Sequence, residues 1–300
     1  KPLTNRVTKG LYPAASTMKI VTGSAGLEEQ LTEGGTRFQN YQACIGGFKI
    51  GNRWARCWHR GHGTLDLNGA IVNSCDVYFY QLGLRLGLDT WAGYARRFGL
   101  GRKTGIDIGE EFDGIIPDME YFSGSEDRIW TRGKMLNLAI GQGEVLVTPV
   151  QMAVLMAAVA NNGKIYRPNV MRSIESPKGM VISRSVVTVR DSVRLQPETL
   201  AFIRTSLVNV VNNGTGVRAR MRNFQVAGKT GTAENPHGED HSWFVGYAPA
   251  DNPTIAVVAI IENAPHGAAV PIVRRVIESH LIEDTDFRMA TLPLTAGSGY

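Results

Sequence analysis

A change in hydrophobic pattern near residue 163 constrains the fold of this chain more than any other feature. Before it, apolar side chains recur with helical spacing, most completely over residues 149–161. After it come short runs rich in β-branched residues, and the longest cover residues 224–232, 243–248 and 254–262. Helices gathered ahead of strands are typical of mixed folds with segregated elements. We therefore expect an α/β (α+β) fold, with a helical lobe over about 64–162 and a sheet lobe over about 163–282.

The size of the chain allows both lobes to share one core. Its 300 residues are 43% hydrophobic, which suits one large domain or two closely packed lobes. The net charge is +5, but Lys and Arg are scattered and form no basic helix or strip, so we expect no nucleic-acid partner. No apolar run approaches the about 20 residues of a membrane span, and no signal peptide is evident. We expect one domain over residues 1–282 and a flexible tail over residues 283–300.

Ser16 begins a helix-compatible run that reaches Leu27, and Lys19 follows it by one helical turn. Residues three apart share one face of a helix, so Nζ of Lys19 can reach Oγ of Ser16. A lysine shielded from water beside a second cation loses its proton near neutral pH and can serve as a general base. The pair therefore predicts an activated serine nucleophile, although Ser-x-x-Lys also arises by chance on exposed helices.

A second candidate motif is Lys229-Thr230-Gly231-Thr232, which follows apolar residues of a predicted strand. Gly231 would let a substrate backbone approach closely. The hydroxyls of Thr230 and Thr232 can hold a substrate carboxylate beside the ammonium group of Lys229. The alternative is a solvated strand end followed by a turn.

Ser74-Cys75-Asp76 is the third candidate motif and lies in a helical pattern over residues 65–86. A hydroxyl and a carboxylate would project from it toward the same cleft, and Ser74 could relay a proton to a leaving amine. The alternative is ordinary polarity on a helix surface. Together, and in this order, the three motifs form the set found in penicillin-binding proteins and class A β-lactamases.

Further segments extend the likeness. They are Gly10-Leu11-Tyr12-Pro13 ahead of the serine, Gly61-His62-Gly63, and Ile140-Gly141-Gln142-Gly143-Glu144 with Thr148-Pro149. With these segments the chain resembles the class B penicillin-binding proteins over residues 10–282, and in particular the elongation-type branch typified by penicillin-binding protein 2.

The resemblance implies a five-stranded antiparallel sheet and an all-helical lobe, with the active-site cleft between them. In that family two sheet strands precede the serine, and only fifteen residues precede Ser16 here. We therefore expect those strands, the membrane anchor and an upstream domain to be absent from this chain. The resemblance also implies that the full-length protein acts on the periplasmic side of the inner membrane. Its partner there would be a membrane glycan polymerase of the RodA type.

Roles for the motif residues follow from the resemblance. Ser16 would attack the carbonyl of a D-Ala-D-Ala stem peptide or of a β-lactam, Lys19 would take its proton, and Ser74 would pass one to the departing D-Ala. Backbone N–H groups of Ser16 and Thr232 would form the oxyanion hole. Asp76 stands where the family more often has Asn, which replaces an amide donor with an acceptor. No cofactor is implied for catalysis.

Two other functions share these motifs. A β-lactamase or D-Ala-D-Ala carboxypeptidase would pass the acyl group to water, but the Glu-x-x-Leu-Asn context of the class A deacylating glutamate is missing between Ser74 and Lys229. A non-catalytic β-lactam sensor would be acylated once and signal. Transfer to an amine acceptor distinguishes the biosynthetic enzyme from both.

The three cysteines, Cys44, Cys57 and Cys75, lie within one short stretch that also contains His62. An odd, clustered set argues for a metal site or a free thiol, and Cys₃His is a common zinc set. The elongation-type family is known to hold a metal here in some members, so the resemblance implies a structural Zn²⁺. His59 could replace His62 as a ligand. The alternative is a disulfide between Cys44 and Cys57 with Cys75 as a buried thiol.

Overall fold

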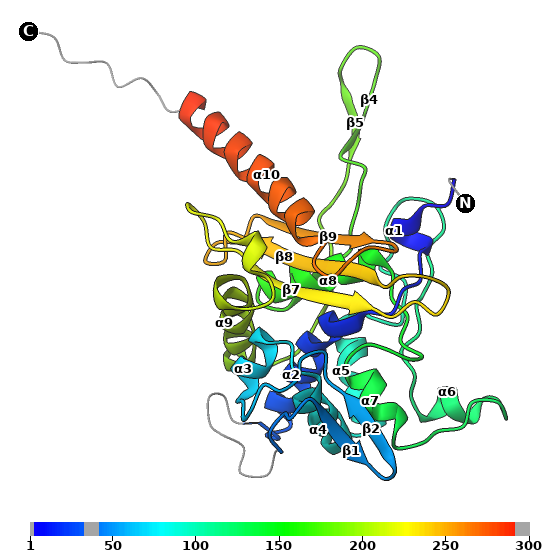
Figure 1. Cartoon of the computed structure of the whole chain (residues 1–300). Helices are drawn as coiled ribbons and strands as arrows, with labels where there is room; N and C mark the ends of the chain where they lie inside the picture. Colours follow the sequence, from blue (N-terminus) through cyan, green and yellow to red (C-terminus); the bar gives the residue numbers. More distant parts are fainter. Residues whose placement is uncertain (1–2, 33–41, 292–300) are drawn as a thin grey trace, which may run out of the picture.

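A three-stranded antiparallel sheet lies against a larger group of helices (Figure 1). The structure is a computed structural model that describes residues 3–32 and 42–291, with side chains up to residue 282. Within these residues the sheet contains β7 (Ala227–Ala233), β8 (His241–Ala248) and β9 (Ile255–Ile261), in that order. The three strands match those that the sequence predicts, and they are the number expected for the family's five-stranded sheet without the two strands that precede the serine.

The two faces of the sheet contact different groups of apolar side chains. Alternate residues of a strand point to opposite faces, and β8 is apolar at nearly every position. Trp243, Val245 and Tyr247 belong to the main core, where α8 (Pro149–Ala160) packs on the sheet. Phe244 belongs to a second core formed with the last helix, α10 (Val270–Thr291). The sheet is therefore covered on both faces, which explains why β8 shows no polar alternation.

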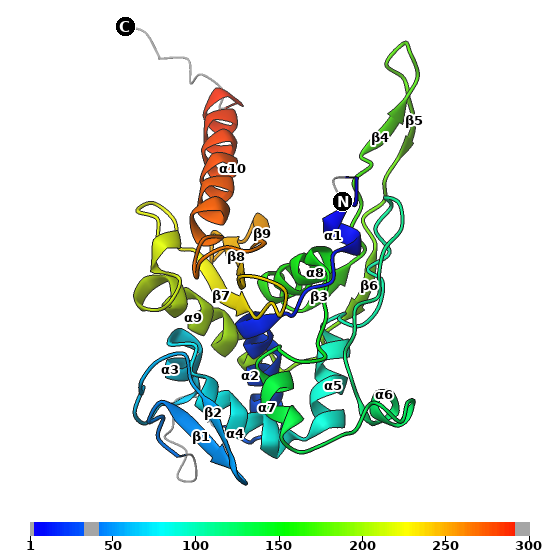
Figure 2. The same cartoon turned by 45° about the vertical axis from the view of Figure 1, so that its right-hand side comes forward.

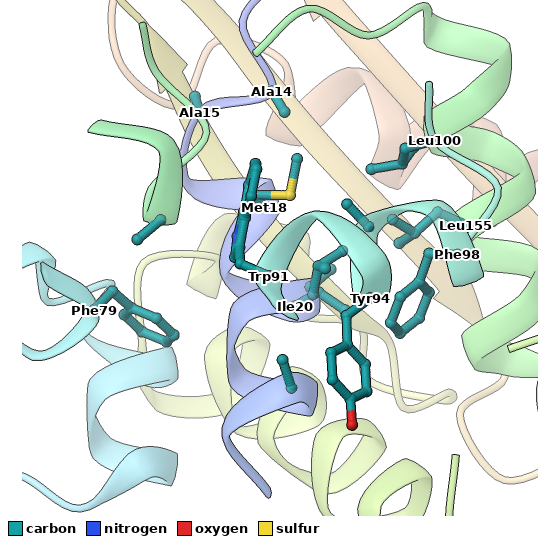
Figure 3. Close-up of a cluster of buried hydrophobic side chains, with 14 of the residues drawn as sticks. Ala14, Ala15, Met18, Ile20, Phe79, Trp91, Tyr94, Phe98, Leu100 and Leu155 are labelled. Atoms are coloured by element: carbon teal, nitrogen blue, oxygen red, sulfur yellow. The ribbon is translucent and has the colours of Figure 1, made fainter. Parts of the chain in front are cut away.

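Helix α2 (Lys19–Glu28) lies at the centre of the helical lobe, and all its residues from Lys19 to Gly26 are buried. Its neighbours include α4 (Asp76–Leu86), α5 (Leu88–Arg97) and α9 (Pro197–Asn213). Figure 3 shows part of the core at α2, where Ile20 of the helix lies among apolar side chains that include Met18, Phe79, Trp91, Tyr94, Phe98 and Leu155. A helix buried on all sides keeps its position well, and α2 carries the lysine of the first motif.

Smaller elements complete the chain. They are the short helices α1 (Arg6–Lys9), α3 (Leu67–Val72), α6 (Met119–Ser123) and α7 (Lys134–Ala139), and the 3₁₀ turns η1 (Ala15–Met18) and η2 (Val217–Ala219). Three antiparallel pairs join β1 (Gly47–Ile50) to β2 (Arg53–Arg56), β3 (Lys164–Tyr166) to β6 (Val189–Ser192), and β4 (Ser173–Glu175) to β5 (Val181–Arg184). The β4–β5 hairpin and α10 both extend away from the body of the molecule (Figure 2).

The structure corrects several details of the predicted elements. Residues 47–56, where no sequence pattern predicted a strand, form the β1–β2 hairpin. The helix predicted over residues 65–86 is two helices, α3 and α4, that meet at residues 73–75. The predicted start of the tail, residue 283, lies too early in the sequence, because α10 continues to Thr291. Residues 292–300 lie outside the described part of the chain.

Candidate active site

A cleft of about 490 Å³ brings the three predicted motifs together between β7 and the helical lobe. Ser16, Ser74 and the segment Thr230–Thr232 all line it. These residues are up to 216 positions apart in the sequence (232 − 16). The fold therefore assembles at one site what the sequence presents as three separate motifs.

Ser16 sits on the 3₁₀ turn η1 that leads into α2, and not in the first turn of the α-helix as predicted. The turn is reached through Ala15, whose φ of +52° changes the direction of the chain. The N–H of Ala15 donates to the carbonyl of Gly141 at 2.8 Å. A Cβ at Gly141 would overlap the backbone of Ala15, so this glycine permits the contact. The Gly141 segment, noted in the sequence only for its likeness, thus supports the turn that carries Ser16.

Gly231 also has a packing reason to lack a side chain. A Cβ there would lie 3.2 Å from Thr17 and 3.1 Å from Trp243. The strand β7 therefore passes close against η1, and its next residue, Thr232, is brought beside the serine turn. The prediction that Gly231 admits a substrate backbone stays a prediction.

Two fully buried lysines meet at the hydroxyl of Ser74. Nζ of Lys19 lies 3.2 Å from Ser74 Oγ, and Nζ of Lys229 lies 2.9 Å from the same atom. Lys19 also donates to the Ser74 carbonyl at 2.8 Å, and Lys229 to the Thr230 carbonyl at 3.1 Å. Burial, together with the charge of Lys19, lowers the pKa of Lys229 well below its ordinary value. A proton can pass between the two lysines through one hydroxyl.

Asp76 is the anion of this cluster. Its Oδ1 accepts from Lys19 at 2.7 Å in an ion pair whose lysine is fully buried and whose aspartate is 11% exposed. Its Oδ2 accepts from the backbone N–H of Trp58 at 3.1 Å. Both oxygens act as acceptors, as the replacement of an amide by a carboxylate predicts.

Two expectations for these motifs need correction. Lys19 is directed to Ser74 and Asp76, and among the described contacts no hydrogen bond joins it to Ser16. Ser74 lies between α3 and α4 and not within a helix, with a left-handed φ of +52°. This turn at Ser74 is what aims its hydroxyl at both lysines.

The threonines of the second motif have partners that sequence reasoning missed. Oγ1 of Thr230 lies 2.6 Å from Oγ1 of Thr215, and Oγ1 of Thr232 lies 2.7 Å from Nδ1 of His266. The side-chain amide of Gln142 donates to the Thr232 carbonyl at 3.0 Å. Gln142 could have been found from the Gly-Gln-Gly segment, whereas Thr215 and His266 carry no local signal.

The predicted metal ligands gather beside this site. One ligand atom from each of Cys44, Cys57, His62 and Cys75 lies within 4.8 Å of the others. Nδ1 of His62 is 3.6 Å from the sulfur of Cys44 and 3.6 Å from that of Cys57. Three sulfurs and one imidazole nitrogen at this spacing fit a tetrahedral zinc set. His59, the alternative ligand, is outside this group and bonds to Gly61.

The three thiols of the cluster are free, without the Cys44–Cys57 disulfide that was the alternative. A hydrogen bond from Cys75 lowers the pKa of Cys57 to about 5, and the same contact raises the pKa of Cys75. Ionising all three thiols at once needs a compensating positive charge, which a divalent cation supplies. Because Cys75 lies between Ser74 and Asp76, the cluster adjoins the middle of the third motif.

Comparison with known proteins agrees with this geometry. Residues 1–278 match the model of the penicillin binding protein transpeptidase domain. The peptidoglycan D,D-transpeptidase MrdA of Haemophilus influenzae is 36% identical over 305 residues, covering 94% of this chain and 46% of that protein. Pseudomonas aeruginosa PBP2, solved with WCK 5153, is 34% identical with a TM-score of 0.81, over 93% of this chain and 63% of that one.

A third relative has been solved in an acylated form. Penicillin-binding protein A of Mycobacterium tuberculosis, as its penicillin G acyl-enzyme complex, is 29% identical with a TM-score of 0.75. The match covers 94% of this chain and 63% of that one. The chain spans about half the length of the curated relatives it matches. Among the residues that the structure describes, no helix is both long and apolar enough to cross a membrane.

Proposed function

This chain belongs to the penicillin-binding protein transpeptidase domain family, and from that premise we propose that it is the catalytic part of an elongation-type peptidoglycan D,D-transpeptidase. Ser16 attacks the carbonyl of a D-Ala-D-Ala stem peptide, the terminal D-Ala leaves, and the acyl group passes to an amine of a neighbouring stem peptide. β-Lactams acylate the same serine. The observation that carries the proposal is that Ser16 and Ser74 line one cleft, and that the buried Lys19 and Lys229 both contact the Ser74 hydroxyl behind it.

Proton transfer in this proposal uses both lysines. The lowered pKa of Lys229 favours its neutral amine, while Lys19 is paired with Asp76. Because the charge of Lys19 is one cause of the lowered pKa of Lys229, a proton that passes from Lys19 through Ser74 Oγ to Lys229 relieves that repulsion, and it leaves Lys19 able to accept the proton of the Ser16 hydroxyl. The Ser16 oxygen then bonds to the substrate carbonyl carbon. As the tetrahedral intermediate collapses, the C–N bond breaks and Ser74 delivers a proton to the departing amine.

The strand β7 provides the binding groups in this proposal. The backbone N–H groups of Ser16 and Thr232 stabilise the oxyanion, a contribution of roughly 3 kcal/mol for each donor in other serine enzymes. Lys229, Thr230 and Thr232 hold the carboxylate of the substrate or of the β-lactam. The contact of β7 with η1 at Gly231 supports this assignment, because it holds Thr232 near the serine turn.

A structural Zn²⁺ held by Cys44, Cys57, His62 and Cys75 is part of the proposal. The close grouping of the four ligand atoms supports it, together with the lowered pKa of Cys57, which favours a thiolate ligand. When bound, the ion would order the segment around β1 and β2 and would fix the backbone on either side of Cys75. It takes no part in the acyl transfer.

The setting of the whole protein is also proposed. Its substrate is found outside the cytoplasmic membrane, so the domain would work on the periplasmic side, anchored to the inner membrane. A RodA-type glycan polymerase, which makes the strands to be cross-linked, is the proposed partner. Both proposals extend the similarity to proteins named peptidoglycan D,D-transpeptidase MrdA.

Two measurements test the proposed function. After incubation with benzylpenicillin, intact mass and peptide mapping should place one adduct on Ser16, and Ser16→Ala should carry none. A D-Ala-D-Ala peptide supplied with a D-amino acid should give the amide formed by transfer. Release of D-Ala with hydrolysis alone, whatever the concentration of the amine, would instead support a carboxypeptidase.

A further inference from the structure

Two aromatic rings join the walls of the catalytic cleft. Trp58 comes from the loop after β2 and His266 from the loop between β9 and α10, and both line the cleft. Their ring centroids are 6.3 Å apart and their planes differ by 21°, which is a stacked arrangement. No motif predicted from the sequence includes either ring.

Each ring is fixed to one of the catalytic motifs. The indole Nε1 of Trp58 donates to the carbonyls of Asn73 and Ser74, both at 3.1 Å. The other end of the pair is Nδ1 of His266, at 2.7 Å from Thr232 Oγ1. Although Trp58 is 57% exposed, its indole nitrogen is therefore anchored at the third motif, and its ring stacks on the imidazole.

The contact of His266 decides where the proton of the Thr232 hydroxyl points. A threonine hydroxyl has one proton to donate and two lone pairs to accept with. If that proton went to Nδ1, the hydroxyl would present only lone pairs to an incoming carboxylate, which repel it. If instead Nδ1–H donates to Oγ1, the hydroxyl proton is free for the carboxylate. A neutral histidine provides this arrangement when the proton sits on Nδ1.

We infer that His266 is a positioning residue for the substrate carboxylate: it holds the Thr232 hydroxyl with its proton directed to the carboxylate, and Trp58 holds His266. This inference rests on the proposed function and deepens it. It assigns the cleft a preference for ligands with a free carboxylate beside the scissile amide, namely peptides ending in a D-amino acid and β-lactams that keep their carboxylic acid.

A pair of ligands isolates this role. Benzylpenicillin and its methyl ester share the reactive ring but differ in the charge that Thr232 would contact. The second-order rate constant of acylation is measured for both with the wild-type chain, His266→Ala and His266→Asn. Exposed His237, in the turn between β7 and β8, provides the matched control His237→Ala. Thermal unfolding of each variant establishes that it is folded.

His266→Ala should lower the rate constant for benzylpenicillin about tenfold, as expected for weakening a hydrogen bond to a charged group, and leave the ester nearly unchanged. His266→Asn, which keeps a polar atom near the position of Nδ1, should recover most of the loss. Thr232→Val should remove the effect of a further His266→Ala change, because the two residues act on one contact.

The outcomes separate this inference from the proposed function. If the wild-type chain forms no adduct on Ser16, the proposed function is wrong. If it does form the adduct but the ratio of the two rate constants is the same in His266→Ala and wild type, only the role of His266 is refuted. An equal loss for both ligands refutes that role as well, because it indicates a change in the acylation step itself.

Discussion

Replacing Asp76 with asparagine tests the electrostatic balance of the site. Asp76 is the carboxylate paired with the fully buried Lys19, and its second oxygen accepts from the N–H of Trp58. Asparagine has the same shape but only one acceptor oxygen and no charge. If its oxygen faces Lys19, its NH₂ group faces the Trp58 N–H, and two donors oppose each other. If it is turned round, its NH₂ group faces the ammonium.

The expected cost follows from these contacts. Removing one charge of a buried pair costs about 3 to 5 kcal/mol, and the lower figure applies because Asp76 keeps some contact with water. At a urea dependence of about 3 kcal/mol per molar, a loss of ~3 kcal/mol lowers the unfolding midpoint by about 1 M. The assay is urea unfolding followed by circular dichroism at neutral pH.

Two further variants make the result interpretable. Asp127→Asn alters an exposed aspartate and should leave the midpoint unchanged within error. Lys19→Met combined with Asp76→Asn removes both charges and should be less destabilised than the sum of the two single changes. An Asp76→Asn midpoint equal to that of Asp127→Asn would refute the view that this carboxylate compensates the buried lysine.

The other predictions concern the lysines and the metal cluster. Lys19→Ala should abolish the penicilloyl adduct in mass spectra and also lower stability, by about 3 kcal/mol, because Asp76 is left unpaired; an adduct formed at the wild-type rate would contradict the proposed base. The lowered pKa of Lys229 means that between that pKa and about 10.4 the unfolded chain binds more protons than the folded one, so stability rises with pH in this window. The unfolding temperature of wild type relative to Lys229→Met should therefore increase from pH 7 to pH 9.5. A decrease would contradict the lowered pKa of Lys229. Protein purified without added metal should contain near-stoichiometric zinc by elemental analysis, and a strong chelator should lower its unfolding temperature; no zinc together with one titratable thiol would favour the disulfide.

The elements with the clearest patterns were predicted well from the sequence. The helix predicted at 149–161 is α8, since it has proline at its start and a long apolar pattern. The break at residues 73–75 was missed because the apolar pattern of 65–86 continues across it. Periodicity reports which side chains are buried, and it does not report a single residue with left-handed φ.

The residues of the candidate site also divide into those with a local sequence signal and those without one. Ser16, Ser74 and Lys229 were predicted because each belongs to a motif with fixed local spacing. Thr215 and His266 were missed, because each meets its motif only through the packing of other elements, across 15 and 34 residues. The contact of Lys19 with Ser74 and Asp76 was missed for a related reason. The spacing of a helix shows which residues share a face, but it does not show which neighbouring group a flexible lysine side chain contacts.

The left-handed backbone of Ser74 has an evolutionary consequence. Threonine is the usual exchange partner of serine, and it would preserve the hydroxyl that lies between Lys19 and Lys229. A β-branched side chain is strained at a φ of +52°, however, at a cost of roughly 1 to 3 kcal/mol. Drift from serine to threonine, neutral at many surface sites, is therefore opposed here by the shape of the main chain even though the hydroxyl would be kept. A lineage that made the exchange would first have to rebuild the turn between α3 and α4.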